Sequence, residues 1–261
     1  AAIAQLEARL GVRLFERSRT GILLSAAGEA LRFRAAGLQT LLANAAGDVD
    51  LVRQGYPGPL RIGGTPGALV SLLPDALARL EARMGPLPVS IVERSDTDLV
   101  AMLLDGQIEL AFVTTGIGTV PEGIEERTLS QDRFALITGP ACEDLPDPVS
   151  LADVGDLPWV LPHAKGAFRR QVDALFIAAQ VAEPLNVIRC DSLLTTKAIV
   201  RGSSRITILP REVVAPELAS GALRALEIKD SSLRRKIGIR TVMGAELTRG
   251  ARDLLAELAS N

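Results

Sequence analysis

The fold is decided by residues 3–29, near the start of the chain, which read IAQLEARLGVRLFERSRTGILLSAAGE. Ile3, Leu6 and Leu10 recur at helical spacing. Gly11 stands where the C-terminus of a helix favours a residue that tolerates a positive φ. We therefore expect a helix that ends at about residue 10.

A short hairpin is expected after this helix. The apolar runs 14–15 and 22–24 are separated by a polar segment, residues 16–21, that ends in glycine and suits a hairpin loop. Arg17 and Arg19 would stand at its tip, where guanidinium groups can contact a phosphate backbone or a minor groove. Taken alone, the same segment is equally consistent with an ordinary solvated turn.

A new helix is expected to begin directly after the hairpin. The hydroxyl of Ser25 can cap a helix N-terminus, and no proline occurs from Ser25 to Gln54. The order is therefore a helix end, a glycine stop, a hairpin with arginines at its tip, and a capped helix. This is the layout of a winged helix.

Residues 3–31 resemble the conserved core of the LysR-type transcriptional regulators. The family pattern is Ile-x-x-Leu-Glu-x-x-Leu-Gly-x-x-Leu-Phe-x-Arg, followed by a wing and Leu-(Thr/Ser)-x-x-Gly. The chain matches this pattern at Ile3, Leu6, Glu7, Leu10, Gly11, Leu14, Phe15, Arg17, Leu24, Ser25 and Gly28. The resemblance implies DNA binding, through residues that correspond here to Arg13, Arg17, Ser18, Arg19 and Thr20.

The resemblance also indicates that the sequence starts inside the recognition helix. In the family, the helix that enters the major groove begins several residues before the position of Ile3, and most base-contacting side chains come from that earlier part. The chain begins at Ala1 without an initiator Met. We interpret residues 1–24 as the remnant of a winged helix-turn-helix domain, and we expect specific DNA binding to be weakened in this chain.

Charge is distributed unevenly along the chain. The 261 residues carry a net charge of −2 with a pI near 5.6, which by itself argues against a nucleic-acid binder. Residues 1–54 hold seven arginines and five acidic residues, so the remainder is acidic. A mildly basic head on an acidic body is consistent with a DNA-contacting segment joined to a domain that has another task.

Few residues could support metal or redox chemistry. His163 is the single histidine, and Cys142 and Cys190 lie far apart and match no metal-binding spacing. The sequence therefore predicts no metal and no cofactor, and the cysteines are interpreted as small buried residues rather than a redox-sensing pair. No run approaches the roughly 20 apolar residues of a transmembrane helix, and no signal peptide is visible. We expect a cytoplasmic protein without a membrane partner.

The helix expected over residues 25–54 carries a heptad repeat. Its apolar residues recur at alternating spacings of four and three. They are Leu31, Ala35, Leu38, Leu42, Ala45, Val49 and Val52. This pattern predicts a coiled coil between two copies of the chain, and the alternative is a single amphipathic helix lying on its own domain. The helix ends at a hinge rich in glycine and proline, so residues 25–57 form the linker.

Strand and helix signals alternate from residue 58 onward. The first unit has strands at 60–63, 89–92 and 108–113 and helices at 68–83 and 98–104, which indicates βαβ units and a parallel sheet. A second unit begins near Phe134. Its expected strands are 135–137, 157–161, 185–188 and 206–210, its helices are 167–179 and 192–201, and the chain closes with a strand at 236–241 and a helix at 246–258.

By the same resemblance, this α/β body is a two-lobed, periplasmic-binding-protein-like effector domain over residues 58–261, preceded by the partial winged helix and the long linker helix. Lobe I would comprise about residues 58–132 and 235–261. Lobe II would comprise about residues 133–234.

Three loops of the first unit follow the carboxyl ends of its strands, where open parallel sheets bind ligands. They carry Thr65, Pro66 and Gly67, then Ser95 and Asp96, then Thr114. Two of these loops run into helix N-termini, which favour anions, whereas the charge of Asp96 would repel one. The ligand could be a sugar, an amino-containing compound or a weakly acidic metabolite. Alternatively, Thr65, Ser95 and Asp96 could each simply be an N-cap. The resemblance adds His163, Asp191 and Ser192 on the opposite lobe.

The resemblance implies a ligand-responsive transcriptional regulator, in which a small metabolite between the lobes changes the arrangement of the oligomer and the bending of DNA. It further implies a homodimer through the linker helix and a tetramer through the effector domains. The alternative is the solute-binding protein of a transporter, which shares the two-lobed fold but requires an export signal and no wing. The sequence lacks a Ser-His-Asp order and a Gly-x-Gly-x-x-Gly motif after a strand, so we do not expect an enzyme.

Overall fold

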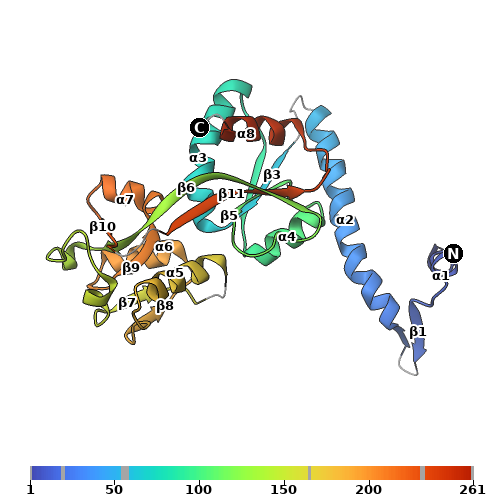
Figure 1. Ribbon diagram of the computed structural model, residues 1–261. Helices are drawn as coiled ribbons and strands as arrows, with labels where there is room; N and C mark the ends of the chain where they lie inside the picture. Colours follow the sequence, from blue (N-terminus) through green and yellow to red (C-terminus); the bar gives the residue numbers. More distant parts are fainter. Residues whose placement is uncertain (1, 19–20, 54–58, 164–165, 230–232, 260–261) are drawn as a thin grey trace.

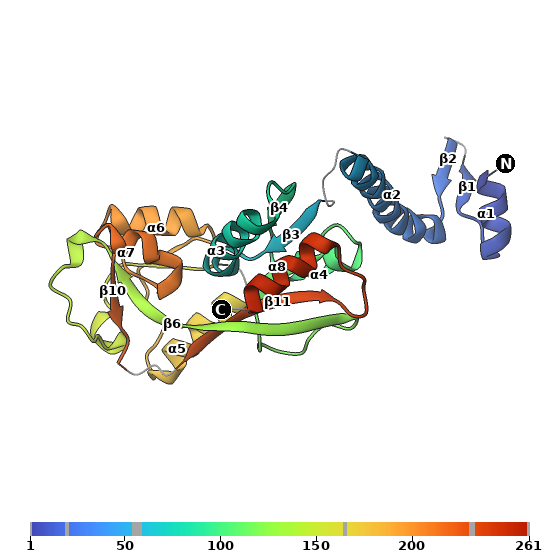
Figure 2. The same ribbon diagram turned by 90° about the horizontal axis from the view of Figure 1, so that it is seen from above.

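The computed structural model describes residues 2–18, 21–53, 59–163, 166–229 and 233–259. Three parts follow one another along the chain: a small head at the N-terminus, one long helix, and a body of two lobes (Figures 1 and 2). None of the described helices combines the length and the apolar character needed to cross a membrane.

The head consists of a helix and a hairpin, as predicted. Helix α1 (Ala2–Leu10) ends at Gly11, whose φ is +68°. Strands β1 (Phe15–Ser18) and β2 (Gly21–Leu24) pair antiparallel. Helix α2 (Ala26–Arg53) follows directly.

Contacts within the head give physical reasons for several positions of the sequence motif. The carboxylate of Glu7 accepts a hydrogen bond from the Leu14 backbone N–H at 2.7 Å. The Ser25 hydroxyl donates to the Arg13 carbonyl at 2.7 Å and accepts from the Gly28 N–H at 3.0 Å, so it caps α2 and fixes the hairpin. Gly28 lies against the Leu14 carbonyl, where a Cβ atom would clash. Glycine is therefore required at the point where α2 crosses the base of the hairpin.

Helix α2 presents two adjacent faces to different surroundings. One face lies on lobe I, where Gly37 approaches Asp105 and Leu41 approaches Gly106. On the same side, Asp48 forms an ion pair with Arg61, with oxygen–nitrogen distances of 2.5 and 3.3 Å.

The other face of α2 carries the predicted heptad residues. Leu38, Leu42 and Val49 are 59%, 71% and 60% exposed, Ala35 and Ala45 are also exposed, and Leu31 is half-buried. The side chain of Val52 lies outside the described residues. Each heptad residue of this face follows its lobe-facing neighbour by one position, which is a rotation of about 100° around the helix. Docking on the chain's own lobe and pairing with a second copy therefore use different faces.

Lobe I is built around parallel strands. Strand β3 (Leu60–Gly64) pairs with β4 (Val89–Glu93) on one side and with β5 (Leu110–Thr114) on the other. Helices α3 (Pro66–Met84) and α8 (Arg249–Ala259) cover one face of the sheet, and α4 (Asp96–Leu104) covers the other. Strands β3 and β5 are therefore buried on both faces and read as near-continuous apolar runs, whereas the edge strand β4 is partly exposed.

Lobe II packs around Trp159. Its strands are β7 (Trp159–Leu161), β8 (Val187–Arg189), β9 (Thr207–Pro210) and β10 (Arg224–Glu227), and its helices are α5 (Ala167–Ala178), α6 (Leu193–Arg201) and α7 (Ala215–Ala219). Trp159 is fully buried, donates from Nε1 to the Val154 carbonyl at 3.0 Å, and meets Phe176 edge-on with ring centroids 5.5 Å apart. Strands β7 and β8 are parallel, so their carboxyl ends face the same side.

Two long strands connect the lobes. Strand β6 (Ile124–Thr138) pairs with β11 (Arg234–Val242) as far as Arg133, and from Phe134 it pairs with β9 and β10 instead. In Figure 2, β6 runs as one ribbon from lobe I into lobe II. The sequence predicted only residues 135–137 of this strand, because residues 125–133 are mostly polar and carry no apolar alternation.

Candidate functional site

A cavity of about 390 Å³ lies between the two lobes. It opens at the carboxyl ends of the parallel strands of both lobes: β3 and β4 on one side, β7 and β8 on the other. In open α/β sheets this is the position at which ligands bind. A volume of this size suits a small molecule.

Lobe I supplies the polar wall of the cavity. The wall contains Thr65, Pro66 and Gly67 at the start of α3, and Glu93, Arg94, Ser95 and Asp96 between β4 and α4. Thr65 is the N-cap residue of α3 in position, yet its side chain makes no capping hydrogen bond. The Ser95 hydroxyl does cap α4, since it accepts from the Asp98 N–H at 3.3 Å. The Thr65 hydroxyl is therefore the better placed of the two for a ligand.

Lobe II supplies a mostly apolar wall. Its apolar members come from β7, from the start of α5 and α6, and from β9 and the turn after it: Val160, Leu161, Pro162, Ala167, Phe168, Leu193, Leu209, Pro210 and Val213. The start of α5 also faces the cavity, and its N-cap residue Gly166 has no side chain that could cap the helix. The free amides of an uncapped helix N-terminus attract an oxygen acceptor.

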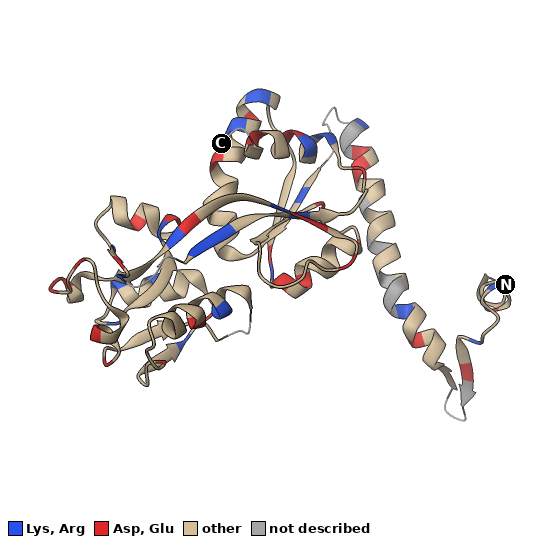
Figure 3. Ribbon diagram, in the orientation of Figure 1, with Lys and Arg blue, Asp and Glu red and all other residues tan. Residues whose placement is uncertain are grey.

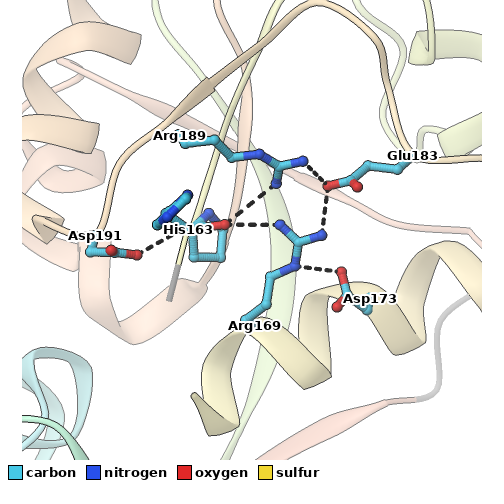
Figure 4. A network of polar contacts seen from close by, with 7 residues as sticks. His163, Arg169, Asp173, Glu183, Arg189 and Asp191 are labelled. Atoms are coloured by element: carbon cyan, nitrogen blue, oxygen red, sulfur yellow. Dashed lines mark hydrogen bonds and ion pairs between the residues drawn. The ribbon is translucent and has the colours of Figure 1, made fainter. Parts of the chain in front are cut away.

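Arg169 sits at the rim of this wall within a network of ion pairs (Figure 4). Its guanidinium donates to Asp173 at 2.7 Å, to the Pro162 carbonyl at 2.9 Å and to Glu183 at 2.8 Å. The hydrogen bond to Asp173 is the main cause that raises the pKa of Arg169 above its ordinary value. Arg189 also pairs with Glu183, at 2.7 Å. This arrangement holds the strand end and the helix start of lobe II in fixed relative positions.

A buried ion pair lies where the connecting strands meet the cavity. Arg235 on β11 donates to both carboxylate oxygens of Asp132 on β6, at 3.1 and 2.7 Å, and both side chains are almost fully buried. Arg235 also donates to the Ser71 hydroxyl at 3.1 Å and to the Gly67 carbonyl at 3.4 Å. It therefore ties the connecting strands to α3, next to the cavity that it lines. Figure 3 shows the basic residues gathered on this part of the connecting strands.

The predicted ligand-binding residues fall into two groups. The cavity is lined by Thr65, Pro66, Gly67, Ser95, Asp96 and Asp191. Thr114, His163 and Ser192 do not line it. Thr114 is buried at the end of β5, between β3 and β11 in the sheet. His163 is exposed and touches Asp191 through its backbone N–H at 2.7 Å, and Ser192 is the exposed N-cap of α6.

Several lining residues were missed from the sequence. They are Glu93, Arg94, Arg235 and most of the lobe II wall, from Val160 to Val213. The carboxyl-end rule, applied to the strand at 159–161, would have pointed to Pro162 and the start of α5. Arg235 carried no such signal, because it reaches the cavity only through the pairing of β11 with β6.

The predicted DNA contacts are only partly described. Arg13 is exposed in the turn before β1, and its carbonyl accepts from Ser25. Arg17 and Ser18 belong to β1, where they pair with Ile22 and Gly21. Their side chains lie outside the described residues, as do Arg19 and Thr20 entirely.

The two cysteines are free thiols in different surroundings. Cys142 lies beside the core of lobe II, and burial raises the pKa of its thiol. Its thiol donates to the Ser204 carbonyl at 3.4 Å, whereas that of Cys190 donates to the Ser192 carbonyl at 3.6 Å and lines the cavity. Both are half-buried, whereas the sequence was interpreted as placing them among small buried residues.

Two family models match the chain. Residues 53–261 match the LysR substrate binding domain, and residues 1–29 match the bacterial regulatory helix-turn-helix protein of the lysR family. The chain belongs to the LysR family of transcriptional regulators. It is a LysR-type regulator with an effector-binding domain, and this membership decides against the solute-binding protein of a transporter.

Curated LysR-type relatives match nearly the whole chain. The regulator BbuR of Bordetella bronchiseptica is 30% identical over 88% of this chain and 70% of its own length. A probable hydrogen peroxide-inducible genes activator of Streptomyces viridosporus is 27% identical over 98% of this chain and 82% of its own. These relatives are transcriptional regulators.

Solved structures of LysR-type regulators share the fold. The crystal structure of CbnR superposes with a TM-score of 0.70 at 20% identity, over 99% of this chain and 86% of that one. OxyR of Corynebacterium glutamicum superposes with a TM-score of 0.66 at 24% identity, over 99% and 80% of the two chains. The head, the long helix and the two-lobed effector domain are thus a known LysR-type arrangement.

Proposed function

We propose that this LysR-type regulator senses a small metabolite in the cavity between its lobes and performs no chemistry on it. The observation that carries the proposal is the cavity itself, at which strand ends and helix N-termini of both lobes converge. The proposed contacts are Thr65, Gly67, Ser95, Asp96 and Asp191. A ligand that contacts both lobes favours one relative arrangement of them, because only that arrangement offers all contacts.

The long helix α2 connects the effector domain to the head that would contact DNA. We propose that α2 pairs with α2 of a second copy through the exposed heptad face, and that effector domains join dimers into a tetramer. Full-length CbnR has been crystallised in complex with its target DNA, so a protein of this fold binds DNA. In this chain the hairpin β1–β2 would contact the phosphate backbone, and the protein would act in the cytoplasm.

The Arg235–Asp132 pair offers a physical link between ligand and oligomer. It joins the connecting strands to the start of α3, and α3 begins at the proposed ligand contacts Thr65 and Gly67. Lobe I also carries α2, through Arg61 and Asp48. A change in the relative position of the lobes would therefore move the C-terminal part of α2, because the Arg235–Asp132 and Arg61–Asp48 ion pairs connect it to the cavity.

Thr65→Val tests the proposed site. The Thr65 side chain makes no capping hydrogen bond, so the substitution should change the free energy of unfolding by no more than about 0.5 kcal/mol. A ligand group left without its hydroxyl partner costs about 1–3 kcal/mol, which weakens binding by about 5- to 150-fold. The measurement is a screen of metabolites for a rise in melting temperature, followed by titration calorimetry of each compound that raises it.

Thr97→Val is the matched control, since Thr97 is an exposed residue of α4 that does not line the cavity. It should keep the full ligand response. A metabolite bound equally well by wild type and Thr65→Val would contradict the assignment, and so would loss of the dimer in Thr65→Val.

A further inference from the structure

The two lobes differ in the polar contacts that they offer to a ligand. The proposed contacts on lobe I lie within residues 65–67 and 95–96, whereas lobe II contributes Asp191 alone. The Asp191 carboxylate already accepts a hydrogen bond from the His163 backbone N–H at 2.7 Å. A further polar partner on lobe II would strengthen the preference of a ligand for one arrangement of the lobes.

Two threonines of lobe II carry hydroxyls that are free for such a contact. Thr196 lies in the first half of α6 and Thr207 begins β9, and both line the cavity. Neither hydroxyl forms a hydrogen bond within the described residues. The Thr196 backbone N–H donates to the Ser192 carbonyl at 2.9 Å. The Thr196 hydroxyl does not bond back to this carbonyl, as a threonine hydroxyl in a helix often does.

Both hydroxyl oxygens remain accessible. In the described part of the chain, the buried side-chain polar atoms that have neither a hydrogen-bond partner nor accessible surface belong to Asp96, Thr138, Gln171 and Glu217. The oxygens of Thr196 and Thr207 are not among these atoms, and the cavity is the open space that the two residues line. Thr196 is 6% exposed and Thr207 is 1% exposed, so Thr196 is the better placed of the two.

The surroundings of the two hydroxyls carry no charge. The other lining residues that α6 and β9 supply are Leu193, Leu209 and Pro210. A charged ligand group against this wall would lose its hydration without gaining an opposite charge. A hydroxyl or carbonyl oxygen fits better, because the hydroxyl of threonine can both donate and accept a hydrogen bond.

We infer that Thr196 is a specificity-determining contact on lobe II, which binds a neutral hydroxyl or carbonyl oxygen of the ligand, with Thr207 as a second, weaker contact. The inference rests on the proposed sensor function and names a chemical group of its ligand. The apolar part of the ligand would lie against Leu161 and Phe168. A second polar group directed at Thr65 would let the same molecule bond to both lobes.

Probes built on similar phenylalkyl skeletons test this inference on the full chain. Ethylbenzene, 1-phenylethanol and acetophenone differ in the presence of a hydroxyl or a carbonyl, and 1-phenylethylamine and 2-phenylpropanoate carry a charge instead. Binding is measured by melting temperature at pH 7 and then by calorimetry. We expect the alcohol and the ketone to bind about fivefold more tightly than ethylbenzene, the effect of one neutral hydrogen bond, and the charged probes to bind more weakly than the alcohol.

Three results of the probe series would overturn the inference. They are equal binding of ethylbenzene and both oxygen-bearing probes, tightest binding by a charged probe, and absence of binding by every probe.

Substitutions of the two threonines locate the effect. Thr196→Val replaces the hydroxyl by a methyl group of similar size, so the preference for 1-phenylethanol over ethylbenzene should fall about fivefold. Thr196→Ser keeps a hydroxyl and should keep the preference. Thr207→Val removes the less exposed hydroxyl and should reduce the preference by a smaller factor.

The matched control is Thr138→Val. It removes another buried, unpartnered hydroxyl of lobe II, from a residue that does not line the cavity, and should leave the preference unchanged. A preference that survives in Thr196→Val, or that falls equally in Thr138→Val, would refute the assigned contact.

The two proposals fail in different ways. If a library metabolite binds, and Thr65→Val weakens its binding whereas Thr196→Val does not, the cavity remains the sensor site and the Thr196 contact is wrong. If neither the probe series nor the metabolite library raises the melting temperature, the sensor function itself loses its support.

Discussion

The double substitution Leu38→Glu and Leu42→Glu is expected to halve the mass of the native assembly. Both side chains are mostly exposed on α2, at 59% and 71%, on the face that does not contact lobe I. Burying one leucine contributes about 1.5–3 kcal/mol, and a pair of α2 helices would bury four at these two positions. Loss of even half the smaller total weakens association by about a hundredfold. Sedimentation equilibrium over a range of protein concentrations measures the mass.

The matched control places two glutamates on another exposed apolar surface, at Ile177 and Leu185 in lobe II, which are 75% and 102% exposed. This variant adds the same charge without touching α2. If the mass falls in the control and not in the α2 variant, pairing through the heptad face is wrong, and effector domains hold the assembly together.

Asp132→Ala is expected to lower the free energy of unfolding by about 3–5 kcal/mol. It leaves the guanidinium of Arg235 almost fully buried without its carboxylate, and an uncompensated buried charge costs this much. The remaining partners of Arg235, the Ser71 hydroxyl and the Gly67 carbonyl, are neutral and cannot replace it. Urea unfolding followed by circular dichroism gives the change.

Two further variants separate the buried charge from other effects. Glu227→Ala breaks the exposed pair between Glu227 on β10 and Arg133, the neighbour of Asp132 on β6, and we expect a loss of less than about 1 kcal/mol. The double substitution Asp132→Leu with Arg235→Met removes both charges and should lose less than Asp132→Ala alone. A loss below about 1 kcal/mol in Asp132→Ala itself would show that the pair is not a structural link.

The head of the protein was predictable because its signals are local. Gly11 ends α1, Ser25 caps α2, and Gly28 lets α2 pass close to the Leu14 carbonyl. All these contacts are local or cross one short hairpin. The heptad repeat likewise predicted α2, because a helix of 28 residues is long enough to repeat its apolar period several times. Its docking face was hidden, because Asp105 and Arg61 belong to a later part of the chain.

The cavity was predictable only in part. Residues 65–67 and 95–96 follow strands that are recognisable as apolar runs. They were therefore predicted as ligand contacts, because open α/β sheets bind ligands beyond the carboxyl ends of their strands. Thr114 follows such a strand too, but the order of strands in the sheet buries it, and sequence alone does not give that order. The Arg235–Asp132 pair joins residues 103 positions apart. The sequence predicted most of β11, but not the polar part of β6 that carries Asp132, and it did not show that the two strands pair.

Amide hydrogen exchange tests the central claim most directly, on the full chain with a compound that raises its melting temperature. A sensor cavity between the lobes predicts slowed exchange at both walls together: residues 64–67 and 93–97 of lobe I, and residues 160–163, 166–169 and 190–196 of lobe II. Exchange in the α1–β2 head should change far less. Protection confined to one lobe, or located away from these segments, would contradict ligand binding in the cavity between the lobes.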